Sequence, residues 1–146
     1  MIIRKAESKD KNLFIKLANE FYHLPAVLHT IDISNFEKTF DAVMQPSPFT
    51  SLFFAEENGT TAGYVLLSFT WSNEAGGLTV WIEEIYICPE FQGNGLGSEL
   101  LTFVKNSYPD AKRFRLEVSP ENEKVKKLYL KYGFEFLSYQ QMVCEV

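Results

Sequence analysis

The sequence lacks the features that place a chain in a membrane or in an oxidising compartment. No apolar run approaches the roughly 20 residues that a transmembrane helix needs, and the polar start MIIRKAESKDKN is unlike a signal peptide. Only two cysteines are present, Cys88 and Cys144, and their spacing suits neither a disulfide framework nor a metal site. We therefore expect a cytoplasmic protein with no membrane partner and no metal.

Runs of basic residues are also missing, and the net charge is −5. Because phosphate binding needs a basic patch, a nucleic-acid partner is not expected. An acidic surface is compatible with a cationic substrate, although charge alone does not establish one. The 146 residues are 46% hydrophobic and 23% charged, the balance of a single globular domain over residues 1–146.

The order of helix and strand patterns predicts a mixed α/β layer without regular βα alternation. Asn58-Gly59 between two strand patterns predicts a tight hairpin. Helix starts are predicted at Ser8, at the capping box Ser34-x-x-Glu37 and at Ser119-Pro120. The expected elements are a strand over 2–6, a helix over 8–22, a helix from 34 that Pro46 and Pro48 stop, strands over 50–57, 61–71 and 78–88, a helix with Leu96, Leu100, Leu101 and Val104 on one side, a strand over 114–118, a helix from 119 to about 132, and one or two closing strands within 134–146.

A glycine-rich turn, Pro89–Ser98, joins a predicted strand directly to a predicted helix. Gly93, Gly95 and Gly97 can turn backbone N–H groups toward one point, at the positive end of the helix, where a pyrophosphate would be stabilised. The spacing Gly-x-Gly-x-Gly differs from the dinucleotide fingerprint, and no lysine follows as in a P-loop. A nucleotide-binding protein for ATP or NAD, and a turn that binds nothing, are the alternatives that this motif alone leaves open.

Two motifs together resemble the GNAT superfamily of N-acetyltransferases. Gln92-x-x-Gly95-x-Gly97 looks like the coenzyme A signature of that family, in which the first residue is arginine or glutamine. Further on, the segment Asn122-x-x-Val125-x-x-Leu128-Tyr129-x-Lys131-x-Gly133-Phe134 is similar to its C-terminal helix motif, where a small residue usually stands in place of Val125. The order of elements also agrees from end to end.

The resemblance implies a GNAT-like α/β fold with a central mixed, mostly antiparallel sheet of six to seven strands and about four helices. It implies an acetyl-CoA-dependent N-acetyltransferase that acts on a primary amine by direct attack in a ternary complex. We expect a small cationic acceptor, such as a polyamine, an aminoglycoside or a lysine-like molecule. A protein or peptide acetyltransferase, and a non-catalytic acyl-CoA-binding module, are the alternatives. A homodimer is common in the family.

The cofactor-binding residues that the resemblance implies lie at the end of the fourth strand, in the glycine turn and on the last helix. They are Ile85, Tyr86, Ile87, Gln92, Gly93, Asn94, Gly95, Leu96, Gly97, Ser98, Asn122 and Tyr129. The family places the backbone of Ile85 and Ile87 along the pantetheine arm, with the Ile87 N–H as the oxyanion donor. Asn122 could instead be a helix cap.

Acetyl transfer requires an amine that has lost its proton, and an alkyl ammonium titrates near ~10.4. Glu83 and Glu84 lie in an apolar strand, where consecutive side chains point to opposite faces, so at most one is expected on the substrate side. The resemblance favours Glu83 as the catalytic base, acting through water. The alternatives are Glu84 as the base, water alone, and a strand-edge charge that only faces solvent.

The resemblance also makes Tyr129 the acid that protonates the leaving thiolate, unless it only fills the core. Cys88 as a nucleophile has no neighbouring His–carboxylate pair in the sequence, so a buried cysteine is the preferred interpretation. For the acceptor pocket, the candidate residues are Tyr22, His23, Trp81 and Glu84. The alternatives are packing or a surface role for His23, core packing for Trp81 and a solvent-facing strand-edge charge for Glu84.

Overall fold

The structure is a computed structural model that describes residues 1–46 and 49–146. Its elements in chain order are β1 (Ile2–Lys5), η1 (Ser8–Asp10), α1 (Lys11–Phe21), α2 (Ile33–Met44), β2 (Thr50–Glu57), β3 (Thr60–Ser72), β4 (Gly77–Ile87), η2 (Pro89–Phe91), α3 (Leu96–Ser107), β5 (Arg113–Leu116) and α4 (Glu123–Lys131). None of the described helices is long and apolar enough to cross a bilayer. Pro48, expected to help stop the second helix, lies outside the described residues.

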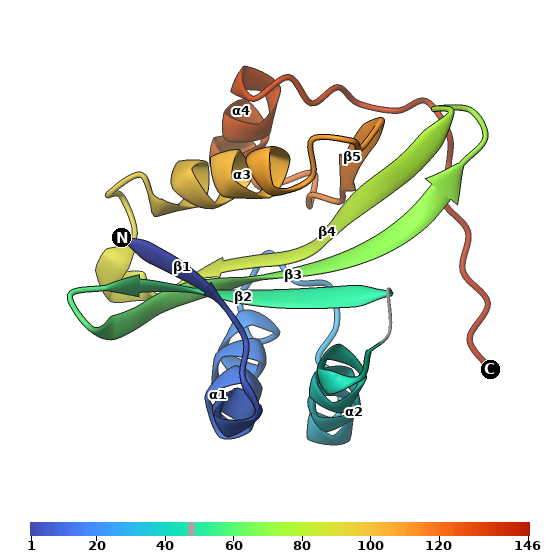
Figure 1. The fold of residues 1–146 in the computed structure, drawn as a ribbon. Helices are drawn as coiled ribbons and strands as arrows, with labels where there is room; N and C mark the ends of the chain where they lie inside the picture. The colour runs from blue at the N-terminus through green and yellow to red at the C-terminus, as the bar shows by residue number, and fades with distance from the viewer. Residues whose placement is uncertain (47–48) are drawn as a thin grey trace.

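The strands form one sheet in the order β1-β2-β3-β4-β5, with helices on both faces (Figure 1). The first three pairs are antiparallel and β4–β5 is parallel, which confirms the mixed, mostly antiparallel sheet. Helices α1 and α2 cover one face, and α3 with α4 covers the other. The fold class is as expected, but the described sheet has five strands rather than six to seven.

The missing strands were expected in the tail, Phe134–Val146, where the structure has neither helix nor strand. The tail runs past β5 to the tip of the β3–β4 hairpin, where the Tyr139 hydroxyl donates a hydrogen bond of 3.4 Å to a Glu74 carboxylate oxygen (Figure 1). A strand needs a neighbour that completes its backbone hydrogen bonds, and the tail joins no ladder in this sheet. The prediction of closing strands is therefore wrong for the single chain.

The hairpin between β2 and β3 forms as predicted. Asn58 and Gly59 have φ angles of 51° and 79°, the left-handed pair that a two-residue type I′ turn requires. Further along β3, Gly63 is needed for a different reason. A Cβ there would lie 2.1 Å from the Tyr86 carbonyl oxygen, so only glycine allows β3 and β4 to approach this closely.

Two apolar clusters hold the helices on the sheet. Under α1 and α2, the rings of Phe14 and Tyr64 meet edge to face with centroids 5.5 Å apart, and Phe40 packs on Phe14. Under α3, the four residues predicted to share one side are all buried. The predicted helix faces are therefore confirmed, and the sheet is covered on both sides at the level of β4.

The first helix does not start at Ser8 as predicted. Glu7 and Asp10 form a reciprocal capping box around a single 3-10 turn, and the α-helix begins only at Lys11. Asp10 is buried, and its two carboxylate oxygens accept hydrogen bonds of 2.7 and 3.0 Å from the Arg4 guanidinium. This pairing lowers the pKa of Asp10 and ties the helix start to β1.

Two other helix starts also differ from the prediction. Asp32, not Ser34, caps α2, because its carboxylate accepts a 2.8 Å hydrogen bond from the Ser34 N–H. Asn122 caps α4 through a 3.4 Å hydrogen bond from the Val125 N–H, three residues after the predicted Ser119-Pro120 start. Sequence patterns found all three helices but displaced their first turns.

Candidate active site

The sheet opens on one side of β4. β5 pairs with β4 only from Thr79 to Ile82, whereas β4 continues to Ile87. No described strand lies beside the last five residues of β4 on that side. Because the two strands separate after Ile82, the backbone of the last part of β4 has no partner strand on this side.

The ladder with β3 determines which backbone groups face this edge. The Cys88 N–H donates a 2.9 Å hydrogen bond to the Ala62 carbonyl. Because antiparallel pairs alternate between bonded and non-bonded, Tyr86 points its backbone groups toward β3, and Ile85 and Ile87 point theirs toward the open edge. The arrangement is the one expected for Ile85 and Ile87, except that the Ile87 carbonyl already accepts a 3.0 Å hydrogen bond from the Gln92 side-chain amide.

Tyr86 is not brought to the open edge, although it was expected among the cofactor-binding residues. Its side chain is buried on the α1–α2 face, and its hydroxyl donates a 2.9 Å hydrogen bond to Glu20 at the end of α1. Burial raises the pKa of Tyr86, and the Glu20 hydrogen bond adds to this effect. The alternation along the strand therefore places the Tyr86 side chain on the α1–α2 face of the sheet.

The glycine turn after β4 has the conformation that a phosphate cradle needs. Gly93 and Gly95 have φ angles of 82° and 86°, a region that other residues adopt only with strain. An added Cβ at either position would meet no atom within 4 Å, so no other residue covers the backbone there and a ligand can approach it. Gly97 lies inside α3, where an added Cβ would be 3.9 Å from the Leu128 side chain of α4, an ordinary van der Waals contact.

The N-terminus of α3 has no side-chain cap. Gly95 is the N-cap, and the first helical hydrogen bond runs from the Glu99 N–H to the Gly95 carbonyl at 3.1 Å. The N–H groups of Leu96, Gly97 and Ser98 therefore have no partner inside the helix. Together with the helix dipole, these groups form a site for an anion, and Gln92 and Asn94 are exposed beside it.

A β-bulge in β4 brings both glutamates to the same face of the sheet. Leu66 pairs with Glu84 and Leu67 with Ile82, so Glu83 is the extra, unpaired residue. The Glu83 carboxylate accepts a hydrogen bond from the Ser68 hydroxyl, and Glu84 accepts one from the Tyr64 hydroxyl. Ser68 and Tyr64 are an even number of residues apart on β3 and share one face, that of α1 and α2.

The expectation that the side chains of these two adjacent glutamates point to opposite faces of the sheet is therefore wrong. Strict alternation fails where the bulge inserts a residue, and this insertion depends on the pairing with β3 rather than on the sequence of β4. The two carboxylates differ in environment, however. Glu83 is exposed, and Glu84 is 9% exposed beneath α1.

Glu84 is enclosed by two phenols. Its carboxylate oxygens accept hydrogen bonds of 2.7 Å from the Tyr22 hydroxyl and 2.7 Å from the Tyr64 hydroxyl. Burial raises the pKa of Glu84, more than the two hydrogen bonds lower it, and the nearby Glu83 charge also raises it. Burial and the Glu84 charge likewise raise the pKa of Tyr22. The site thus holds a carboxylate whose ionised form is costly.

The other acceptor-side candidates are less closely grouped. Trp81 lies two residues before Glu83, and the Arg115 guanidinium stacks over its ring at 4.2 Å. His23 is exposed after α1, and its Nδ1 lies 2.6 Å from the Asn19 carbonyl oxygen. The structure therefore brings Tyr22 close to Glu84 and Glu83. His23 forms no hydrogen bond with either glutamate.

Tyr129 lies on α4, and Asn122 is the N-cap residue of this helix. Tyr129 packs in the cluster under α3, with its ring centroid 5.8 Å from that of Phe134, and burial raises its pKa to about 12. The Asn122 side-chain oxygen caps the helix, which leaves its amide N–H groups for another partner. Both the capping and the ligand interpretation of Asn122 are thus compatible with the geometry.

Cys88 does not have the environment of a nucleophile. The thiol is 5% exposed, and burial raises its pKa to about 11, so the reactive thiolate is scarce at neutral pH. Its sulfur lies 3.8 Å from the Thr61 carbonyl oxygen. This favours the interpretation of Cys88 as a buried structural cysteine.

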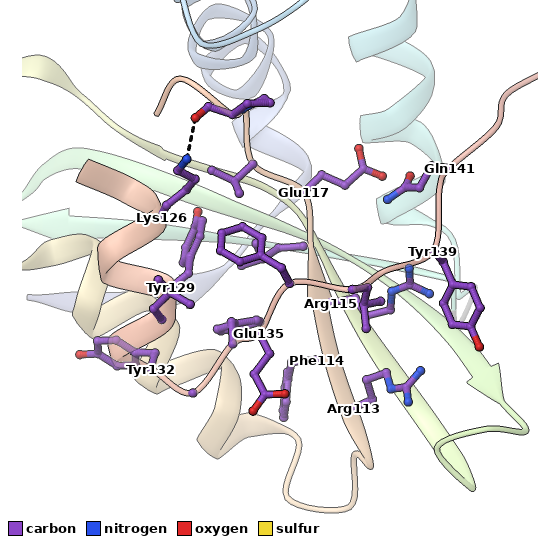
Figure 2. Close-up of a pocket in the computed structure, with 18 of the residues that line it drawn as sticks. Arg113, Phe114, Arg115, Glu117, Lys126, Tyr129, Tyr132, Glu135, Tyr139 and Gln141 are labelled. Atoms are coloured by element: carbon purple, nitrogen blue, oxygen red, sulfur yellow. Dashed lines mark hydrogen bonds between the residues drawn. The ribbon is translucent and has the colours of Figure 1, made fainter. Parts of the chain in front are cut away.

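A cavity of about 870 Å³ lies between β5, α4 and the tail. Figure 2 shows Tyr129 on its α4 side, Arg113 and Arg115 on the β5 side, and Tyr139 on the tail. Of the site residues predicted from the sequence, Tyr129 alone lines it among the described residues. The open edge of β4 and the glycine turn therefore form a different part of the molecule from this cavity.

The profile of the acetyltransferase (GNAT) family matches residues 15–134, which include β4, the glycine turn and α4. The chain belongs to the GNAT acetyltransferase family. It is accordingly an N-acetyltransferase with acetyl-CoA as co-substrate, as the two sequence motifs predicted.

Relatives of this GNAT acetyltransferase align over most of its length. It is similar to the thialysine N-epsilon-acetyltransferase of Mus musculus, with 26% identity over 146 residues that cover 93% of this chain and 85% of that protein. Its fold resembles a possible acetyltransferase from Clostridium difficile 630, with a TM-score of 0.85, 20% identity and coverage of 99% and 97%. It also resembles a predicted acetyltransferase with acetyl-CoA from Clostridium acetobutylicum, with a TM-score of 0.80, 21% identity and coverage of 98% and 95%.

The residues of the GNAT site fit acetyl-CoA. The three free N–H groups at the start of α3 suit a pyrophosphate, since the bare turn at Gly95 leaves its approach open. The outward backbone of Ile85 and the Ile87 N–H suit an extended amide chain such as pantetheine, which could pair with β4 like an added strand. Both features depend on backbone groups, which explains why few charged side chains mark the site.

Three residues that hydrogen-bond with this group were not found from the sequence. Tyr64 and Ser68 come from β3 and Glu20 from α1, and each forms a hydrogen bond with Glu84, Glu83 or Tyr86. The signal that could have found the first two is the even spacing of polar groups on an otherwise apolar strand. Nothing in the sequence marks Glu20, because its partner lies 66 residues away.

Proposed function

We propose that residues 1–146 act as one domain that acetylates the primary amine of a small cationic molecule in the cytoplasm. The observation that carries the proposal is the β4 bulge, which brings the Glu83 and Glu84 carboxylates to one face beside the open edge of β4. A polyamine, an aminoglycoside or a lysine-like molecule has the required chemistry. The relative from Mus musculus is named for an ε-amine acceptor, which supports the same class.

Cation recognition follows from the charges on this face. Within the described residues, the hydrogen bonds of Glu20, Glu83 and Glu84 come from hydroxyl groups and not from a basic side chain. Their charges are thus not neutralised locally, and an ammonium ion would be attracted by all three. The raised pKa of Glu84 is the consequence expected of a buried carboxylate that lacks such a cation.

Glu83 is the proposed base. It is exposed, so water can connect its carboxylate to the amine, and the Ser68 hydroxyl fixes its orientation. Glu84, held by two phenols, shapes the pocket and positions Tyr22. In this proposal Glu83, which water reaches, removes the proton, and the enclosed Glu84 attracts the cation.

Acetyl-CoA, when bound, supplies an activated carbonyl and a thiolate leaving group. The Ile87 N–H would donate to the oxygen on which charge develops, a contribution typical of backbone oxyanion donors. Tyr129 keeps its proton at neutral pH because its pKa is about 12, and it would donate that proton toward the departing sulfur. Direct attack in a ternary complex needs no protein nucleophile, in agreement with the buried Cys88.

The test is an amine-panel assay that detects released thiol, with Glu83→Gln compared against Glu37→Gln. Glu37 is an exposed glutamate on α2 and serves as the matched control. We expect turnover of a diamine or aminoglycoside, a fall of about 10²–10⁴-fold in kcat/KM for Glu83→Gln, and an unchanged acetyl-CoA Kd in both variants. Full turnover by Glu83→Gln would remove Glu83 from its role. Turnover of peptide N-termini alone would replace the small-amine proposal.

A homodimer is the partner that we propose in addition. Apolar side chains of the tail are exposed to an unusual degree, with Met142 97% and Val143 82% exposed. These exposed apolar side chains support the proposal, because apolar area is costly to expose to water.

A further inference from the structure

Arg115 on β5 is the one arginine that has no acidic partner among the residues that the structure describes. Arg4 and Arg113 are held in ion pairs at 2.6 to 2.9 Å, whereas no ion pair joins Arg115 to a carboxylate, Glu117 included. Figure 2 shows Arg115 beside the cavity, and its side chain is half-buried. A partly desolvated guanidinium attracts an anion more strongly than one in open water. Arg115 is therefore a free cation at a place where a cation matters.

The ring of Trp81 holds the Arg115 guanidinium in place. The two residues are paired across the β4–β5 ladder, and the guanidinium carbon lies 4.2 Å from the ring centroid. Stacking uses the flat face of the guanidinium and leaves the N–H groups along its edge free. These groups form the fork that binds a carboxylate with two parallel hydrogen bonds. Arg115 thus presents a fork that loses little freedom when a carboxylate binds.

Arg115 and Glu83 lie on the same face of the sheet. Val80 and Ile82 are buried in the cluster under α3, so the Trp81 side chain between them points toward the α1–α2 face. Arg115 stacks on that ring, and the β4 bulge turns Glu83 to the same face. A cation without an acidic partner and a carboxylate without a basic partner are therefore neighbours on one surface.

The distance between these two positions suits a particular length of molecule. Arg115 is directly opposite Trp81, and Glu83 follows two residues later. With a strand spacing of roughly 4.8 Å and a rise of roughly 3.3 Å per residue, the two Cα atoms are about 8 Å apart. An extended chain with bonds of about 1.5 Å rises roughly 1.25 Å per bond, so an amine and a carboxylate joined through five carbon atoms are about 7.5 Å apart. Such a molecule can meet both residues at once, whereas an amine and a carboxylate on the same carbon cannot.

We propose that Arg115 determines the acceptor specificity by binding the carboxylate of an ω-amino acid whose terminal amine is acetylated beside Glu83. This inference rests on the proposed function and narrows its acceptor class. A lysine-like acid has the second group that Arg115 binds, whereas a polyamine has a second ammonium that Arg115 repels. The transfer step is unchanged: the amine nitrogen bonds to the acetyl carbon as the thioester C–S bond breaks, Glu83 takes the amine proton through water, and Tyr129 protonates the sulfur.

The first test compares 6-aminohexanoate with cadaverine as acceptors in the thiol-release assay. Both have an amine on a five-carbon chain, and they differ only in the second group, a carboxylate or an ammonium. We expect the wild-type kcat/KM to be at least about tenfold higher for 6-aminohexanoate. Arg115→Met keeps an unbranched side chain over Trp81 without the charge, so it should lower kcat/KM for 6-aminohexanoate and raise it for cadaverine. Arg113→Met is the matched control, because the Arg113 guanidinium is engaged by Glu74, and it should keep the wild-type preference.

The outcomes separate this inference from the proposed function. A wild type that acetylates cadaverine as well as 6-aminohexanoate, or an Arg115→Met variant that keeps the preference, would overturn the role of Arg115 and leave amine acetylation in place. No thiol release with any amine of the panel would overturn the proposed function and this inference together.

Trp81 provides a readout that does not depend on turnover. The chain has two tryptophans, and Trp71 is 77% exposed, so Trp71→Phe leaves Trp81 as the single indole. In this background, with CoA bound, 6-aminohexanoate should cause a saturable change in fluorescence, because its carboxylate alters the charge above the ring. The change should be lost when Arg115→Met is added and should be weaker with cadaverine. An equal change with and without Arg115 would contradict binding of the carboxylate by this residue.

Discussion

Replacement of Gly95 by alanine tests the phosphate cradle, and Gly59→Ala is its matched control. Both glycines have left-handed φ angles, 86° and 79°, and an added Cβ would meet no atom within 4 Å at either site. Each alanine therefore clashes with no other residue, and its only cost is the left-handed backbone conformation, about 1–2 kcal/mol. For a chain of this length, we expect a fall in Tm of roughly 3–8 °C for both variants.

The two variants should differ in ligand binding alone. At Gly95 the strain would be relieved by a shift of the turn that precedes α3, and this shift would misdirect the N–H groups of Leu96–Ser98. We expect the acetyl-CoA Kd, measured by calorimetry, to rise at least about tenfold for Gly95→Ala, equivalent to about 1.4 kcal/mol. Gly59 lies in the β2–β3 turn, and its variant should bind normally. Equal Kd values for the two variants, with equal losses of Tm, would refute the cradle.

Three further substitutions test the chemistry. Cys88→Ala should keep kcat within a few-fold in the thiol-release assay, and a complete loss in a folded variant would restore a covalent mechanism. Tyr129→Phe should lower kcat by about 10²-fold or more at unchanged acetyl-CoA Kd. An unchanged kcat would show that Tyr129 only packs in the core and does not protonate the thiolate. The raised pKa of Glu84 adds stability below its unfolded value, near ~4.3, and that stability is lost as pH rises through the folded value. The Tm advantage of wild type over Glu84→Gln should thus shrink from pH 4 to pH 7, and a growing advantage would contradict the shift.

Local patterns predicted the parts of the fold that depend on neighbours in sequence. The Asn58-Gly59 turn, the buried face of α3 and the bare glycine turn follow from residues within one or two turns of each other. The helix starts were less predictable. Asp10 pairs with Arg4 on β1 and lies in a 3-10 turn before the α-helix. The sequence of the helix alone gives no sign of this pairing.

Features that depend on distant pairing could not be predicted in the same way. The bulge at Glu83 exists because Leu66 and Leu67 of β3 pair with Glu84 and Ile82, so the extra residue is defined by the register of two strands. The sequence of β4 alone favours strict alternation, which gave the wrong face for one glutamate. The expected closing strands were likewise read from composition, whereas a strand forms only where a neighbour accepts its hydrogen bonds.

The same bulge explains how one strand can carry two carboxylates with different tasks. In a regular strand, one of two adjacent glutamates would face the α3 layer, among apolar side chains, at a large desolvation cost. The inserted residue turns both toward α1, where Glu84 is enclosed by phenols and Glu83 stays in water. A base that exchanges protons must stay in contact with solvent, whereas a buried charge attracts a cation most strongly. We therefore infer that the bulge, more than either glutamate alone, makes this face suited to a cationic amine.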